Sequence, residues 1–192
     1  MCMNKINKKS DAQLLYRSPP TKLGLKYPTI DDLRKRARRR VPRFAFDYVD
    51  GAAGANETGM HRNAAALDSI EVVPRYGVEN FKADMEVDLF GRRFSAPIAI
   101  APMGIPGMVW PGGEEAFAKA AQDAKMPFTL GSSSAATIER IAELAPDCTW
   151  FQLYRMPNND LAINFDLVKR AELAGVHALI LTLDVPARTK RP

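Results

Sequence analysis

Cysteine is scarce in this sequence, and its positions exclude two kinds of site. Among 192 residues there are only Cys2, at the extreme terminus, and Cys148, in an apolar neighbourhood. Two thiols in such places make neither a disulfide framework nor the ligand spacing of a metal centre. We therefore expect no metal site and interpret both residues as ordinary thiols.

Long apolar runs are also missing. No stretch reaches the roughly 20 consecutive apolar residues that a membrane helix needs. The start, MCMNKINKKSDAQLL, has a basic flank with no apolar run behind it, unlike a secretory signal. Because 46% of the residues are hydrophobic, the chain can still bury a core. We expect a globular protein kept in the cytoplasm, with peripheral attachment to a membrane as the alternative.

Acidic residues are outnumbered by basic ones, 22 to 27, which gives a net charge of +5. The densest basic run, DLRKRARRRVPR, extends from Asp31 to Arg43. Thr29 followed by Asp32 predicts a helix start beside it, and such a helix usually turns its charges to water. Nucleic acid or anionic lipid is the alternative partner for this run. Because the run lacks the interleaved aromatic residues that stack on bases, we expect no nucleic-acid partner.

The first 28 residues form a region of their own. They are polar, and Pro19, Pro20 and Pro28 disfavour a helix within or after them. We therefore expect residues 1–28 to be a flexible arm.

Residues 29–96 are expected to form a preamble of helices and short strands. The pattern is helical from Thr29 to Gly54, with Pro42 suited to the first turn of a second helix and Gly51 to its exit. Short strands around turns are predicted at Ile70–Pro74, Met85–Leu89 and Arg93–Ser95.

From residue 97 onwards, short apolar runs alternate with helical stretches. The runs begin at residues 98, 128, 149 and 178, so their spacings of 30, 21 and 29 residues are those of βαβ units. The pattern predicts a parallel α/β sheet. The runs are Ile98–Ala101, Phe128–Leu130, Thr149–Leu153 and Ala178–Thr182, and the helical stretches between them are Glu114–Ala124, Thr137–Ala145 and Asn164–Ala174.

A (β/α)₈ barrel is the favoured form of this sheet. No GxGxxG follows the first run, which removes the best support for a dinucleotide-binding fold. A complete barrel takes about 250 residues, whereas residues 97–192 provide room for four strands. We therefore expect residues 97–192 to be the first four β/α units of an incomplete barrel, and the chain to be truncated.

Function in such a barrel collects at the carboxyl ends of the strands. The four apolar runs end in APMG, GSSS, QLY and TLD. Each ending offers small or polar groups at the place where a ligand would lie, so these endings predict the position of an active site.

Five segments in order resemble the FMN-dependent α-hydroxy acid dehydrogenase and oxidase family, which includes glycolate oxidase, L-lactate dehydrogenase and mandelate dehydrogenase. The resemblance runs from about Thr29 to the last residue. The segments are FDYVDGAAG (Phe46–Gly54), HRNAAALDSI (His61–Ile70), PIAIAPMG (Pro97–Gly104), FQLY (Phe151–Tyr154) and TLDVPARTKR (Thr182–Arg191).

The resemblance implies that FMN lies across the mouth of the barrel. The family's backbone contacts at the exit of the first strand match Pro102, Met103 and Gly104. Its glutamine and threonine that bond the polar edge of the flavin match Gln152 and Thr182. An amide and a hydroxyl suit an edge that presents both donors and acceptors.

The resemblance also implies an α-hydroxy acid substrate, whose carboxylate requires arginine or phenol donors. Tyr48 matches the family tyrosine that binds the carboxylate, and Tyr154 the one near the reacting hydroxyl. Arg191 matches a substrate-binding arginine, although Arg188 and Lys190 lie close to it. Asp184 matches the carboxylate that pairs with the family's catalytic histidine and stabilises its protonated form.

Two features depart from the family pattern. The catalytic histidine has no match, because His177 precedes the fourth strand and His61 lies in the preamble. Gly131 stands where many members have a flavin-bonding serine, and Ser132 or Ser133 is left as a substitute.

We expect the full-length protein to oxidise an L-2-hydroxy acid, lactate-like or mandelate-like, to the 2-oxo acid. Glycine at position 104 is typical of the dehydrogenases, so the expected partner is a quinone or another electron carrier. A homo-oligomer is a further expectation. The alternatives are a non-catalytic module that binds anions through residues 31–43 and another flavin-binding or phosphate-binding barrel.

Overall fold

The computed structural model describes residues 22–54, 56–77 and 84–183. The chain divides into two compact units, Met1–Phe46 and Asp47–Pro192. Within the described residues, no helix has the length and apolar character needed to cross a membrane.

The described part of the first unit is helical, and its capping confirms a predicted helix start. Helix α3 spans Ile30–Arg38. The Thr29 hydroxyl accepts a hydrogen bond from the Asp32 N–H at 3.2 Å, and the Asp32 carboxylate accepts one from the Thr29 N–H at 3.2 Å. This reciprocal box satisfies two N–H groups that a helix start otherwise leaves free.

Two further helices flank α3 in the sequence. Helix α4, Arg43–Asp50, follows Pro42 as predicted and crosses the boundary between the units. Helix α2, Lys22–Lys26, lies where we predicted an arm without a helix. The prolines flank this short helix without interrupting it, so its N–H groups remain available for hydrogen bonds.

After the end of α4, the second unit contains a helix that was not predicted from the sequence. Helix α5 spans Thr58–Asp68. After it, the predicted strand Ile70–Pro74 is wrong, because these residues have no regular structure. Val72 and Val73 are 88% and 83% exposed, so they have no sheet face against which to pack.

A short hairpin follows, close to its predicted place. Strand β1, Val87–Leu89, pairs antiparallel with β2, Arg92–Phe94. Phe90 and Gly91 make the turn with φ values of 50° and 78°, as a two-residue hairpin requires.

The predicted parallel sheet is present. Its strands are β3, Phe128–Gly131, β4, Thr149–Tyr154, and β5, Ala178–Thr182, in the order β3-β4-β5. The run Ile98–Ala101 was predicted to be the first strand, and this is wrong. It contributes only a parallel bridge between Ile100 and Phe128, because the flanking Pro97 and Pro102 have no N–H groups to extend the pairing.

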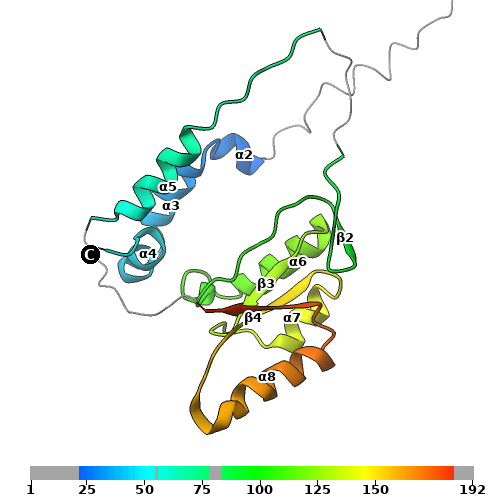
Figure 1. Ribbon diagram of the computed structural model, residues 1–192. Helices are drawn as coiled ribbons and strands as arrows, with labels where there is room; N and C mark the ends of the chain where they lie inside the picture. The colour runs from blue at the N-terminus through cyan, green and yellow to red at the C-terminus, as the bar shows by residue number, and fades with distance from the viewer. Residues whose placement is uncertain (1–21, 55, 78–83, 184–192) are drawn as a thin grey trace, which may run out of the picture. The chain divides into compact units, whose positions relative to one another are not determined.

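Three helices accompany these strands (Figure 1). They are α6, Gly113–Ala124, α7, Ile138–Leu144, and α8, Ala162–Leu173, and α7 packs against both of the others. The strand order follows the chain, and parallel crossovers are right-handed, so α7 and α8 cover the same face of the sheet. This arrangement is that of a partial (β/α)₈ barrel. Two short 3₁₀ turns, η1 at Pro106–Met108 and η2 at Asn158–Leu161, precede α6 and α8.

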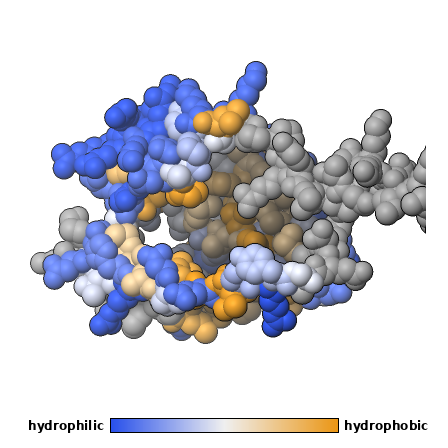
Figure 2. Space-filling view, turned by 90° about the horizontal axis from the view of Figure 1, so that it is seen from above, coloured by the Kyte–Doolittle hydropathy of each residue, from blue (hydrophilic) through white to orange (hydrophobic). Residues whose placement is uncertain are grey.

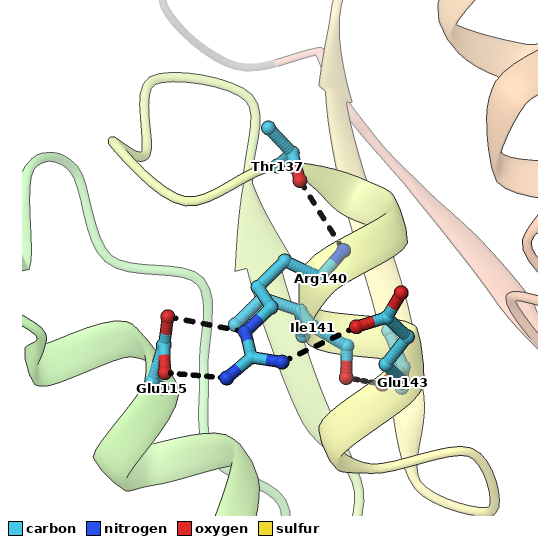
Figure 3. A network of polar contacts seen from close by, with 6 residues as sticks. Glu115, Thr137, Arg140, Ile141 and Glu143 are labelled. Carbon is cyan, nitrogen blue, oxygen red and sulfur yellow. Dashed lines mark hydrogen bonds and ion pairs between the residues drawn. The ribbon is translucent and has the colours of Figure 1, made fainter.

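Ion pairs join the outer helices to one another (Figure 3). Arg140 on α7 bonds the Glu115 carboxylate of α6 at 3.3 Å and Glu143 of its own helix at 3.2 Å. Arg170 on α8 bonds Glu139 on α7 at 2.8 Å. The hydrogen bonds from Arg170 lower the pKa of Glu139 from its ordinary 4.5 to about 2. The helix layer is thus connected by charge as well as by apolar contacts.

The β1–β2 hairpin closes the amino-terminal end of the sheet. The Trp150 ring, near the start of β4, meets Phe90 and Phe94 edge-on, with centroid distances of 5.5 and 6.0 Å. The His177 Nε2 atom, just before β5, lies 2.8 Å from the Phe90 carbonyl oxygen. The opposite, carboxyl-terminal end is therefore the one left for a site.

Candidate functional site

A small cavity of about 50 Å³ lies at the carboxyl ends of the strands. The six predicted residues from the strand endings all line it. Gly131 and Ser133 complete the wall. The full lining is Pro102, Met103, Gly104, Gly131, Ser133, Gln152, Tyr154 and Thr182.

Gln152 is the polar centre of this wall. Its side chain is buried, and it lies on β4 beside Gly131 of β3 and Ile180 of β5. Its Oε1 atom accepts from the Ser132 N–H at 3.3 Å, and its Nε2 atom donates to the Thr182 hydroxyl at 2.9 Å. Because the Thr182 oxygen accepts this bond, its own proton remains available to donate.

Gly131 allows two strand exits to approach closely. A Cβ atom at this position would lie 2.8 Å from the Met103 carbonyl oxygen, a distance that a side chain cannot occupy. A serine at 131 is therefore incompatible with this backbone. Of the two candidate substitutes, Ser133 lines the cavity, whereas Ser132 contributes its N–H to Gln152.

The two predicted substrate-binding tyrosines are partly exposed. Tyr154 ends β4 and is 41% exposed, and Tyr48 on α4 is 42% exposed. The Tyr48 hydroxyl lies 3.4 Å from the position that a Cβ on Gly104 would take. Both phenols are therefore placed at the residues that line the cavity.

A larger cavity of about 430 Å³ shares part of this wall. Met103 and Gly104 belong to both cavities. The rest of the larger one is mostly apolar and is formed by Tyr48, Val49, Pro106, Val109, Trp110, Gly113, Ala116 and Phe117. Hydrophobic side chains reach the surface at the orange areas of Figure 2.

Two predicted site residues, Asp184 and Arg191, lie outside the described residues, as do Arg188 and Lys190, which compete with Arg191. None of the eight lining residues is charged, so the basic side chains at these later positions remain the predicted source of positive charge for a carboxylate. His177 lies at the opposite end of the sheet, against Phe90, as the sequence indicated.

Sequence reasoning missed Asn164, which holds the end of β4. Its side chain is 8% exposed. Its Nδ2 atom donates to the Tyr154 carbonyl oxygen at 2.7 Å, and its Oδ1 atom accepts from the Met156 N–H at 2.8 Å. The predicted helical stretch begins at Asn164, where an asparagine is an ordinary helix start, so no sequence signal distinguished this residue.

The groups at the cavity suit the polar edge of a flavin. Thr182 offers a hydroxyl proton, and Gln152 offers an amide that is already held by two neighbours. The contact of Gly131 with Met103 leaves no side chain between the backbone and a planar ring. The described residues contain no group of three or more side chains able to hold a metal ion.

Comparison with known proteins gives one family. The family described as FMN-dependent dehydrogenase matches residues 37–192. The chain is 38% identical over 165 residues to a 4-hydroxymandelate oxidase from Amycolatopsis orientalis, covering 86% of this chain and 45% of that protein. It is 39% identical to an L-lactate dehydrogenase from Bartonella quintana, covering 81% and 40%. The chain thus spans less than half the length of these relatives.

Solved structures of mandelate-oxidising enzymes superpose on this chain. Mandelate oxidase with (S)-mandelic acid superposes with a TM-score of 0.78 at 36% identity, covering 86% of this chain and 48% of that one. A chimera of (S)-mandelate dehydrogenase gives a TM-score of 0.76 at 32% identity, covering 84% and 44%.

Proposed function

Because this chain belongs to the FMN-dependent dehydrogenase family, we propose that it supplies part of the FMN and substrate site of an enzyme that oxidises an L-2-hydroxy acid to the 2-oxo acid. The observation that carries the proposal is the cavity at the strand ends. Its wall brings together residues from four separate chain segments, three of which carry residues that the family resemblance assigns to the FMN or substrate site.

The chain's residues divide into two groups in this proposal. Pro102, Met103 and Gly104 offer backbone to the flavin, and Gln152 and Thr182 offer hydrogen bonds to its polar edge. When bound, FMN supplies the capacity to accept two electrons from the substrate.

The second group handles the substrate. Tyr48 and Arg191 bind its carboxylate, and Tyr154 donates to or accepts from the hydroxyl that reacts. The hydroxyl proton would go to a histidine base, whose cationic form Asp184 stabilises, and the hydrogen on the carbon that bears this hydroxyl would leave together with the two electrons. His177 does not have this role, since it is held at the opposite end of the sheet.

The test is an amide substitution at Gln152, with a control at Gln122 on helix α6, made in a chain extended to the length of the relatives. We expect this protein to bind FMN and to reduce a dye with lactate or mandelate. Gln152→Glu replaces a donor with a charge and should weaken FMN binding about tenfold or more. Gln122→Ala is the control, because Gln122 pairs with Asp147 away from the cavity. A colourless parent protein would contradict the proposal.

The electron acceptor is proposed to be a quinone or another carrier, with the protein in the cytoplasm or attached peripherally to a membrane. Support comes from Gly104, since glycine at this position is typical of the family's dehydrogenases and alanine of its oxidases. In air, the extended enzyme should therefore form hydrogen peroxide much more slowly than it reduces an artificial acceptor. Equal rates, measured by peroxide assay and dye reduction, would identify an oxidase.

A further inference from the structure

Asn164 ties helix α8 to the end of strand β4. Both polar atoms of its buried amide are used on backbone groups, the Tyr154 carbonyl and the Met156 N–H, at 2.7 and 2.8 Å. These two groups lie on either side of Arg155. The side chain therefore fixes the direction in which the chain leaves the strand.

The sheet itself does not extend this far. Pairing of β4 with β3 ends at Gln152, opposite Gly131, and pairing with β5 ends at Tyr154, opposite Thr182. Beyond Tyr154 the backbone leaves the ladder, and the Asn164 amide holds it there. Tyr154 is thus the last residue of β4 that pairs within the sheet and the first residue that Asn164 bonds.

Gln152, two residues earlier, has separate support. Its amide is held by Ser132 and Thr182, and neither of these residues bonds Asn164. A change at Asn164 should therefore displace Tyr154 while leaving Gln152 in place.

We propose that Asn164 is a positioning residue, which sets the location of the Tyr154 phenol at the cavity. The inference rests on the proposed function, in which Tyr154 contacts the reacting hydroxyl of the substrate. Asn164 itself does not line the cavity, so its effect is exerted through the backbone of residues 154–156.

Gln122 provides a matched control. Its Nε2 atom donates to the Asp147 carboxylate at 2.8 Å, and its Oε1 atom accepts from the Asp147 N–H at 3.2 Å. This is also an amide clamp on a loop beside β4, but it lies before the strand begins. Gln122→Ala removes the same kind of contact at the end away from the cavity.

The first test follows Tyr154 directly in the purified chain labelled with 3-fluorotyrosine, its fluorine resonance assigned with Tyr154→Phe. Asn164→Ala should shift or broaden that resonance, and the Met156 amide should exchange with solvent about tenfold faster. Gln122→Ala should change neither. A Tyr154 resonance that is unchanged in Asn164→Ala, or equally changed in Gln122→Ala, would overturn the proposal.

Asn164→Asp separates the two bonds and guards against general unfolding. It keeps an acceptor for the Met156 N–H but sets an oxygen against the Tyr154 carbonyl. We expect the fluorine resonance to shift while the Met156 amide stays protected. If the resonance keeps its parent position in this variant, the donor bond to Tyr154 does not position the phenol.

Catalysis gives the second test, in the chain extended to the length of the relatives. Asn164→Ala should lower kcat about tenfold or more with FMN affinity unchanged, and Gln122→Ala should lower neither. An unchanged kcat in Asn164→Ala would overturn the claim that the placement of Tyr154 by Asn164 matters for catalysis. If the extended parent protein oxidises no 2-hydroxy acid, the proposed function fails, while the fluorine and exchange measurements still decide whether Asn164 positions Tyr154.

Discussion

At the residue scale, the approach of Gly131 to Met103 sets the shape of the candidate site. Two strand exits meet there without an intervening side chain, and the backbone of Met103 is presented to the cavity. A family serine at this position would need a different backbone. The departure at Gly131 is therefore linked to a particular arrangement of the neighbouring loop.

Gly131→Ala should be destabilising. The new Cβ would lie 2.8 Å from the Met103 carbonyl oxygen, and overpacking of this kind costs about 1–3 kcal/mol. Gly59→Ala is the control, because nothing lies within 4 Å of its added Cβ. Urea unfolding of both variants measures the difference. Equal urea midpoints for Gly131→Ala and Gly59→Ala would show that the loop at Met103 moves to accommodate the added methyl group without loss of stability.

The side chain at position 133 bears on substrate size. The family resemblance implies a bulky tryptophan at the matching position of glycolate oxidase, whereas Ser133 here lines the cavity with a small side chain. A small residue leaves room for a longer or aromatic substrate. We expect the extended enzyme to have a higher kcat/KM for lactate or mandelate than for glycolate. The reverse order, from steady-state rates on the three acids, would contradict this expectation.

At the element scale, the ion pairs of Figure 3 and the Glu139–Arg170 pair join three helices that the sheet alone does not connect. Glu115 and Glu139 both have lowered pKa values, chiefly because arginine side chains bond their carboxylates. These side chains are partly exposed, so solvent screens each pair and the individual contributions are small.

Stability should fall in acid through Glu139. Its pKa is about 2 when folded and 4.5 ordinarily, so the folded state favours the charged form. The contribution is fully present above about pH 4.5 and is lost as the pH falls towards 2. Glu139→Gln should therefore reduce the difference in urea midpoint between pH 6 and pH 3. Glu143→Gln, on the same helix, is a control, because the Glu143 carboxylate bonds Arg140 and not Arg170 in the described part of the chain. If the urea midpoint of Glu139→Gln changes with pH as much as that of the parent protein, the Glu139–Arg170 pair is not the source of the acid sensitivity.

The sequence predicted elements well where their pattern was local. The capping box at Thr29 and the helix over residues 114–124 need only nearby residues. The run Ile98–Ala101 and the segment Ile70–Pro74 were predicted as strands and are not, because a strand requires a partner that the sequence does not reveal. At the site, strand endings indicated which residues meet, whereas the Asn164 contacts depend on the course of the chain after Tyr154.

At the scale of the whole molecule, the described sheet has three strands and one added bridge. The cavity wall carries uncharged groups only, and the one histidine of the sheet region lies at the other end. Such a set meets part of a flavin's edge and offers no base for the proton of a hydroxy acid.

Residues 1–192 expressed alone should therefore retain little FMN and show no oxidation of 2-hydroxy acids. A chain of the length of the relatives should bind FMN and oxidise a 2-hydroxy acid. Flavin absorbance and dye reduction on the two purified proteins provide the measurement. A yellow and active 192-residue protein would show that the base lies within these residues.

The hairpin that closes the amino-terminal end of the sheet has a consequence for synthesis on the ribosome. The two strands of the hairpin are neighbours in the chain, but the ring contact of its turn residue Phe90 with Trp150 joins residues 60 positions apart. At ordinary translation speeds Trp150 is made roughly 3 to 12 s after Phe90. During that interval the Phe90 and Phe94 rings of the nascent hairpin lack the Trp150 ring that packs on them in the folded chain. A ribosome-bound chaperone would therefore have apolar surface to protect at this stage.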